Sequence, residues 1–283
     1  MINFKIKKTS IRWVVALKDE AKVILDYFKL KAVNEKTIYP IYKNEEETHW
    51  LIISGIGRNN SAASTTYLYS YSNASKHTSW INIGIAGSDK GNYGDLYLVD
   101  KISTYQRKKS TYPSTMPKSN LPKMHLLTSD IPISDYSSYE LIDMEGSAFF
   151  DIASKLSSKE FICLMKVISD GPKNDIKEIT KSKISNLIKL NLSKIVDVVS
   201  YYERLSEEEF QIIDKPKLFN EIKSKWHFSE TQSHRLETLL RRIETFCNKR
   251  DIEEKIKHCG TSNSVINVLN SKIKNNLVDW SKY

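Results

Sequence analysis

The hydrophobic and polar positions divide the chain into two parts. Up to residue 203, short apolar runs alternate with segments in which apolar residues recur every three or four positions. The first pattern is typical of buried strands and the second of amphipathic helices. From residue 204 onward, almost every segment follows the helical pattern. We therefore predict an α/β domain with a largely central sheet over residues 11–203 and a helical C-terminal appendage over residues 204–283.

The same pattern predicts the individual elements. Strands are expected over residues 12–17, 36–42, 49–54, 80–85, 94–105, 124–128 and 161–168. Helices are expected from Asp19 or Glu20, from Asn59 or Asn60, and over residues 144–156 and 182–202. The polar segment 106–123 contains Pro113, Pro117 and Pro122 and is expected to be a mobile loop. Helices of the appendage are expected over residues 216–225, 229–249 and 262–280.

Length and composition narrow the class of protein. The 283 residues, 40% of them hydrophobic, suffice for one large domain with an appendage. No apolar run approaches the roughly 20 residues of a membrane-spanning helix, and no apolar stretch follows the lysines of residues 1–10. Cys163, Cys247 and Cys259 follow neither a disulfide pattern nor the spacing of zinc ligands. We therefore expect a cytoplasmic protein without a metal site and without a membrane partner.

The formal net charge of +9 allows two interpretations. One is a lysine-rich, solvated surface, and the other is an anionic partner such as nucleic acid. Cationic residues gather in the appendage at His227, His234, Arg235, Arg241, Arg242, Lys249 and Arg250, and Glu230, Glu237 and Glu244 are interspersed among them. Mixed charges of this kind are typical of a solvated helix face. The solvated surface is therefore the favoured interpretation, and nucleic-acid binding is the alternative.

Four short segments at the ends of predicted strands carry small or acidic residues where a core would need apolar ones. They are residues 16–20, 54–57, 84–87 and 168–170. In open α/β sheets, ligands bind beyond the carboxyl ends of the strands, so these segments are expected to line one crevice. A fifth segment, residues 143–146, begins a predicted helix. Each segment alone is explained by an acidic helix start or a glycine turn, and only their joint occurrence indicates a site.

In this combination the chain resembles the nucleoside phosphorylase/nucleosidase superfamily, most closely its methylthioadenosine/S-adenosylhomocysteine nucleosidase-like hydrolases. The resemblance covers about residues 11–203. It is carried by residues 54–62, residues 82–87 with Gly94 and Asp95 following, residues 143–146 and residues 168–170. It implies a three-layer α/β fold with a central mixed sheet. It also implies a purine nucleoside and water as reactants, no cofactor and a homodimer.

The resemblance assigns catalytic roles to three carboxyl groups. Asp170 corresponds to the general acid that protonates N7 of the purine, and Glu20 to the carboxylate that positions or activates the attacking water. Glu145 corresponds to the carboxylate that binds the ribose hydroxyls. The chemistry of N-glycosidic cleavage fits these roles, because the sugar develops positive charge while the leaving base develops negative charge. A positioned acid or base contributes about 10²–10⁴-fold to such a reaction.

Further residues are expected to contact the substrate. Ser169 orients the acid, and Met144 packs against the sugar. The others are Asp143, Ile85, Ala86, Ile131, Pro132 and Ile133. The sequence departs from the family where Ile85 replaces a small hydroxyl residue, Pro132 replaces an aromatic residue and Gly171-Pro172 replaces a more polar tail. These departures bear on which 5′-modified adenosine is used: methylthioadenosine, adenosylhomocysteine or 5′-deoxyadenosine.

Two alternatives to hydrolysis remain open. A purine nucleoside phosphorylase holds phosphate with arginines and backbone amides, whereas residues 80–87 contain no arginine and Arg58 is the only nearby candidate. Glu20 would repel phosphate but suits water, so hydrolysis is favoured. The second alternative is a nucleoside-binding sensor whose helical tail binds a partner or nucleic acid.

Overall fold

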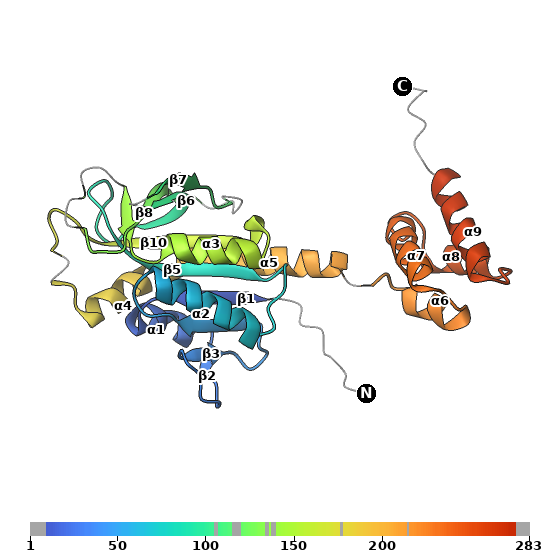
Figure 1. The fold of residues 1–283 in the computed structure, drawn as a ribbon, viewed down its shortest axis with the longest axis horizontal. Coiled ribbons are helices and arrows are strands. Elements are labelled where there is room, and N and C mark those ends of the chain that lie inside the picture. The colour runs from blue at the N-terminus through green and yellow to red at the C-terminus, as the bar shows by residue number, and fades with distance from the viewer. Residues whose placement is uncertain are drawn as a thin grey trace, which may run out of the picture. The chain divides into compact units, whose positions relative to one another are not determined.

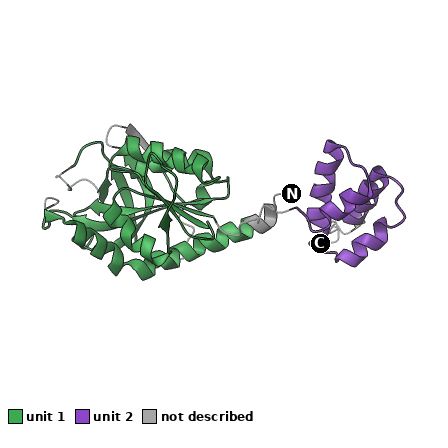
Figure 2. Cartoon of the chain, turned by 90° about the horizontal axis from the view of Figure 1, so that it is seen from below, with its two compact units in different colours: residues 1–212 green, residues 213–283 purple. Residues whose placement is uncertain are grey.

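The computed structural model describes residues 10–104, 107–114, 120–133, 136, 140–175, 178–213 and 215–275. The chain forms two compact units, residues 1–212 and residues 213–283 (Figures 1 and 2). The boundary expected after residue 203 falls inside the helix α5 (Leu192–Ile213). Within the described ranges, no helix combines the length and the apolar character needed to cross a membrane.

Unit 1 is built on a 10-stranded mixed sheet. Its strands are β1 (Ile11–Val15), β2 (Lys31–Ala32), β3 (Ile41–Lys43), β4 (His49–Ile53), β5 (Ser79–Gly87), β6 (Leu96–Thr104), β7 (Arg107–Thr111), β8 (Lys123–Thr128), β9 (Leu141–Asp143) and β10 (Ile162–Asp170). The parallel pairs β1–β4, β1–β5 and β5–β10 form the centre. The strands β5, β10, β6, β8 and β9 pair in that order and close into a ring, because β9 returns to β5.

Helices cover both faces of this sheet (Figure 1). The helices α1 (Lys18–Tyr27), α4 (Lys181–Leu190) and α5 bury apolar residues on one face, and α2 (Arg58–Tyr71) and α3 (Gly146–Leu156) on the other. Successive strand residues point to opposite faces. Accordingly, Trp13 and Val15 join the first core, while Val14 between them joins the second. The predicted three-layer α/β class with a central mixed sheet is confirmed.

Two expected elements of the sheet differ from the structure. The strand expected over residues 36–42 is reduced to β3, because Pro40 has no amide hydrogen to donate and pairing begins at Ile41. The loop expected over residues 106–123 contains β7, which pairs antiparallel with β6 through Ile102 and Thr111. The strand was not predicted because this segment is rich in lysine and proline and lacks the apolar positions that mark a strand.

The helix expected over residues 182–202 is two helices. Asn191 separates α4 from α5, and its side-chain amide donates to the carbonyl oxygens of Leu187 at 3.0 Å and Gly94 at 2.8 Å. The apolar stripe continues across the break, which explains why periodicity alone predicts a single helix.

Unit 2 consists of α6 (Phe219–Lys225), α7 (Glu230–Ile243), α8 (Lys249–Ile256) and α9 (Ser262–Asn275) (Figure 2). Ser229 and Gln232 form a reciprocal cap at the start of α7. The helix expected over residues 229–249 ends at Ile243, and Asn248 caps a separate helix, α8. All of these helices contribute to one hydrophobic core, so unit 2 is a helical unit with a core of its own.

Candidate active site

The structure brings every residue expected to form the site to one cavity of about 270 Å³. These residues are Glu20, Ile85, Ala86, Ile131, Pro132, Ile133, Asp143, Met144, Glu145, Ser169 and Asp170. They come from segments at the ends of β1, β5, β8, β9 and β10, which are far apart in the sequence. The cavity therefore lies where ligands bind in α/β sheets.

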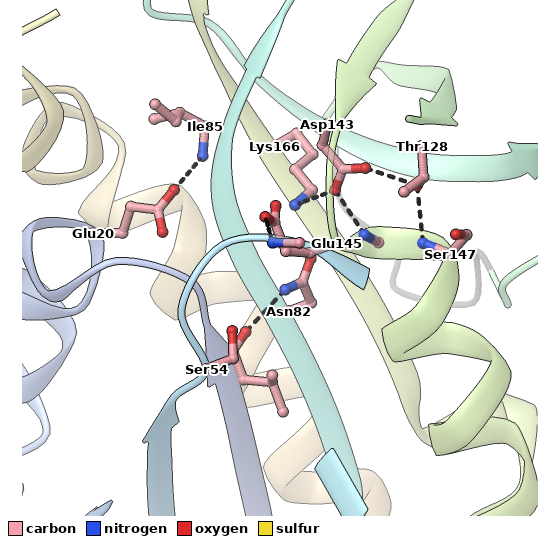
Figure 3. Close-up of polar contacts among 12 residues, drawn as sticks. Glu20, Ser54, Asn82, Ile85, Thr128, Asp143, Glu145, Ser147 and Lys166 are labelled. Atoms are coloured by element: carbon pink, nitrogen blue, oxygen red, sulfur yellow. Dashed lines mark hydrogen bonds and ion pairs between the residues drawn. The ribbon is translucent and has the colours of Figure 1, made fainter. Parts of the chain in front are cut away.

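Glu20 is fixed by two backbone amides. It lies in the first turn of α1, where Oε1 accepts a hydrogen bond of 2.8 Å from the amide of Ile85 (Figure 3). Its Oε2 accepts a second one, also of 2.8 Å, from the amide of Leu17. Burial raises the pKa of Glu20, and the hydrogen bonds from the two amides offset only part of that rise. Gly84 leaves room for the carboxyl group, since a Cβ atom there would lie 2.9 Å from Oε1. Glu20 is thus a buried carboxyl group with a single defined orientation.

Glu145 is held by the glycine loop between β4 and α2. Its Oε1 accepts a hydrogen bond of 2.7 Å from the amide of Gly57, a residue with φ of 99° that favours glycine (Figure 3). Burial, followed by the negative charge of Asp143, raises the pKa of Glu145 to about 7. The expected helix over residues 144–156 begins two positions later, at Gly146, so Met144 and Glu145 lie in the turn that faces the cavity.

Lys166 was not predicted as a site residue, yet it organises the carboxyl groups. Its Nζ lies 2.8 Å from Oδ2 of Asp143, and both side chains are almost completely buried (Figure 3). Burial favours a lower pKa for Lys166, but the negative charges of Asp143 and Glu145 outweigh it and raise the pKa. A single lysine in the otherwise apolar run of residues 161–168 was the available signal, because buried lysines are almost always paired.

Asp143 makes further bonds within the protein. Its Oδ2 also accepts from the amide of Gly146 at 2.8 Å, and its Oδ1 accepts from the hydroxyl of Thr128 at 2.7 Å. The same hydroxyl oxygen accepts from the amide of Ser147 at 2.9 Å. These bonds tie the end of β9 to the start of α3. Asp143 therefore lines the cavity, but both of its carboxyl oxygens are bound to groups of the protein.

A β-bulge directs Ser169 and Asp170 to the cavity. Ile168 pairs with Ala86 and Asp170 with Gly87, so Ser169 is an additional residue in β10. Consecutive strand residues normally point to opposite faces, but a bulge re-aims side chains, and bulges are common beside active sites. Ser169 then donates a hydrogen bond of 2.5 Å to Oδ1 of Asp170. Asp170 is therefore the last residue of the strand, two positions beyond its expected end at Ile168.

Tyr136 also lines the cavity and was not predicted from the sequence. Its hydroxyl donates a hydrogen bond of 2.7 Å to Oδ2 of Asp170. Burial, followed by this hydrogen bond, raises the pKa of Tyr136, so its hydroxyl stays protonated. Tyr136 stands in a polar segment between two strands, and no periodicity marks it as buried.

The electrostatic character of the cavity is acidic. Glu20, Asp143, Glu145 and Asp170 line it, and among the residues that the structure describes no lysine, arginine or histidine does. Arg58, the expected phosphate-binding candidate, forms an ion pair of 3.2 Å with Asp130. No group of three or more potential metal ligands occurs in the described part of the chain. Such a cavity stabilises positive charge on a ligand and opposes the binding of anions.

Comparisons with known proteins establish the fold. No protein-family model matches this sequence, and neither does any curated protein. Among solved structures, an Arabidopsis thaliana 5′-methylthioadenosine nucleosidase matches with a TM-score of 0.59 at 17% identity, over 70% of this chain and 98% of its own. A Neisseria meningitidis 5′-methylthioadenosine/S-adenosylhomocysteine nucleosidase in complex with methylthio-immucillin-A matches with a TM-score of 0.55 at 16% identity, over 68% and 99%.

A Helicobacter pylori futalosine hydrolase matches with a TM-score of 0.54 at 12% identity, over 68% of this chain and 99% of its own. The chain thus has the fold of the nucleoside phosphorylase/nucleosidase superfamily, as its sequence predicted. These structures are covered almost completely, whereas about a third of this chain extends beyond the match.

Proposed function

We propose that this chain is a purine nucleosidase that hydrolyses the N-glycosidic bond of a 5′-modified adenosine to free adenine and the corresponding sugar. The observation that carries the proposal is the convergence of Asp170, Glu20 and Glu145 on one cavity. All lining residues fall between Ala16 and Ile184, so the catalytic domain that we propose lies within residues 11–203. Fold alone does not define function, and the proposal therefore rests on this site.

Asp170 is the proposed acid for the leaving base. When the bond between C1′ and N9 breaks, its electron pair passes to the purine, and a proton from Asp170 on N7 neutralises the base. Ser169 holds Oδ1 of Asp170 at 2.5 Å, which fixes the plane of the carboxyl group. A fixed acid beside the leaving group lowers the barrier because no reorientation is needed during the reaction.

Glu20 and Glu145 are the proposed partners of water and sugar. A water molecule attacks C1′ and loses a proton toward Glu20, whose raised pKa makes the ionised carboxylate a stronger base. Glu145 lies close to the glycine loop and binds the ribose hydroxyls in this proposal. The negative charge of these carboxylates stabilises the positive charge that develops on the sugar.

Water is favoured over phosphate by the charges of the cavity. Phosphorolysis requires an anion at the position of the nucleophile, next to Glu20. The arginine nearest to the glycine loop, Arg58, is engaged by Asp130. A dianion beside buried carboxylates and without a cationic lining is electrostatically disfavoured. These features support hydrolysis rather than a purine nucleoside phosphorylase activity.

The apolar lining supports a substrate with an apolar 5′ group. The cavity is lined by the apolar residues Leu17, Ile56, Ile131, Ile133, Ile142, Met144, Ile179 and Ile184. The solved neighbours include enzymes named for methylthioadenosine and adenosylhomocysteine. We therefore propose methylthioadenosine and 5′-deoxyadenosine as the substrates to test first, together with adenosylhomocysteine, whose 5′ thioether chain ends in a charged amino-acid group.

The test is an assay for free base. The protein is incubated with these three nucleosides and with adenosine and inosine, with and without phosphate, and the released base is quantified by chromatography. We expect adenine from at least one 5′-modified adenosine at a rate independent of phosphate. A rate that depends on phosphate and yields a sugar 1-phosphate would indicate the phosphorylase instead. Absence of base release from every nucleoside would refute the proposal.

A further inference from the structure

Asp170 accepts hydrogen bonds on both carboxyl oxygens from neighbouring side chains. Ser169 donates to Oδ1 at 2.5 Å, and Tyr136 donates to Oδ2 at 2.7 Å. The three side chains are buried, and all three line the cavity. Each oxygen of Asp170 therefore already accepts one hydrogen bond from the protein, and a base that approaches either oxygen meets a side chain bound to it.

The two hydrogen bonds differ in their surroundings. Ser169 is the neighbour of Asp170 in β10, and its hydroxyl also lies 3.4 Å from the carbonyl oxygen of Ala86 in the adjacent strand. The position of Ser169 is thus set by the strand β10 itself. Tyr136 comes from the segment between β8 and β9, the same segment that supplies Ile131, Pro132 and Ile133 to the cavity wall. Of the two donors, Tyr136 is therefore the one that belongs to the cavity wall and not to the strand that carries Asp170.

The ring of Tyr136 packs directly against Gly87, where the lack of a side chain leaves room for it. A Cβ atom on Gly87 would lie 2.4 Å from Cε1 of Tyr136 and 2.7 Å from Oδ2 of Asp170. No residue larger than glycine at this position is compatible with the observed contact between Tyr136 and Asp170. The hydrogen bond is thus supported by the local shape of β5, and it does not depend on the hydroxyl alone.

The size of the cavity agrees with an inward side chain. Its volume of about 270 Å³ lies just below the range of roughly 300–1,000 Å³ that is usual for ligand pockets. Tyr136 is among its lining residues, and only 7% of its surface is exposed to solvent. Rotation of Tyr136 away from Asp170 would enlarge the cavity next to the proposed acid.

We propose that the Tyr136 hydroxyl stands in for the purine base on Oδ2 of Asp170, and that a base binds only by displacing it. This inference rests on the proposed function, because it takes Asp170 as the group that meets the purine. Tyr136 is then an affinity-determining residue that competes with the nucleobase. A ligand that cannot hydrogen-bond Oδ2 has no means of compensating for the lost tyrosine bond, so Tyr136 also selects for a base with a donor or acceptor at that edge.

The experiment is calorimetric titration of adenine into the full-length wild-type protein and the Tyr136→Phe variant. Phenylalanine keeps the ring on Gly87 and removes only the hydroxyl. Since a hydrogen bond to a carboxylate is stronger than a neutral one, we expect its removal to tighten adenine binding by roughly 10-fold. Tyr112→Phe, which removes the hydroxyl of an exposed tyrosine outside the cavity, is the matched control and is expected to bind as the wild type does.

The outcomes separate this inference from the function on which it rests. Tighter binding by Tyr136→Phe alone supports the competition. Equal or weaker binding by Tyr136→Phe, with measurable binding by the wild type, overturns it and leaves the nucleosidase proposal intact. If neither protein binds adenine or releases a base from any nucleoside, both proposals fail. Thermal unfolding of each variant verifies that its fold is retained.

Discussion

The ammonium group of Lys166 lies 2.8 Å from the carboxylate of Asp143, and both side chains are almost completely shielded from solvent. This pair neutralises one of the carboxylates that line the cavity. The positive charge of Lys166 lowers the pKa of Glu20 and of Glu145 against the effect of burial, whereas the negative charge of Asp143 raises both pKa values. Lys166 is thus the cation that partly offsets the cost of gathering several acidic groups in one buried site.

Removal of Lys166 tests this role. Lys166→Met leaves Asp143 buried without its cation, and breaking a buried pair in this way costs about 3–5 kcal/mol. We expect urea unfolding to show a loss of that size. The double variant Lys166→Met with Asp143→Leu removes both charges and should recover part of the stability. The single variant Asp143→Leu completes the comparison, because Asp143 also accepts hydrogen bonds from Thr128 and Gly146. A loss from Lys166→Met that is the same with and without Asp143 would contradict a direct coupling between the two groups.

Glu145 predicts a specific dependence of stability on pH. Its pKa is about 7 in the folded protein, against an ordinary value of 4.5, so the folded state binds the proton more tightly than the unfolded state. The stability that this group contributes is complete below pH 4.5 and is lost as the pH rises through 7. The total contribution of Glu145 to the free energy of unfolding is on the order of 3 kcal/mol.

Glu145→Gln should remove this contribution. Relative to the wild type, the variant is expected to gain unfolding free energy as the pH rises across that window, which denaturant titrations at several pH values measure. A constant difference between the two proteins across the window would show that Glu145 does not titrate there.

Gly84→Ala is expected to impair activity more than stability. Its Cβ atom would lie 2.9 Å from Oε1 of Glu20 and 3.5 Å from Nζ of Lys166. Glu20 would have to move away from the amide of Ile85, so the water that we propose as the nucleophile would lose its defined partner. Gly260→Ala is the control, because nothing lies within 4 Å of a Cβ atom there. Steady-state rates of base release are measured for both variants. Similar rates would show that the position of Glu20 is not important for the reaction.

Asp170→Asn isolates the proposed acid. The carboxamide has nearly the same shape but cannot donate a proton to the base. We expect base release to fall by about 10²–10⁴-fold while nucleoside binding persists. Single-turnover kinetics and equilibrium binding on the same preparation separate the two effects. An unchanged rate would remove Asp170 from its proposed role.

The sequence predicted the cavity because its walls are continuous short segments. Residues 168–170 and 84–87 carry small or acidic residues at predicted strand ends, and the parallel arrangement of β1, β5 and β10 brings such ends together. Pattern and topology predicted the crevice, whereas the resemblance to a known family added residues 143–146 and the individual roles.

Lys166 and Tyr136 could not be placed in the same way. Their roles arise from contacts with Asp143 and Asp170, which lie more than 20 residues away in the sequence and are set by tertiary packing. The break at Asn191 has the same origin, since one partner of its amide is the distant carbonyl of Gly94. Periodicity reports which residues are buried, but not which polar groups satisfy one another across the fold.

The most direct test of the account is the fate of oxygen during cleavage. Methylthioadenosine is incubated with the protein in phosphate-free buffer made with water enriched in heavy oxygen, and the products are analysed by mass spectrometry. If water held near Glu20 attacks C1′, free adenine appears together with a sugar that carries the heavy oxygen. The result that would contradict the account is the absence of free adenine and labelled sugar, both from methylthioadenosine and from the other 5′-modified adenosines.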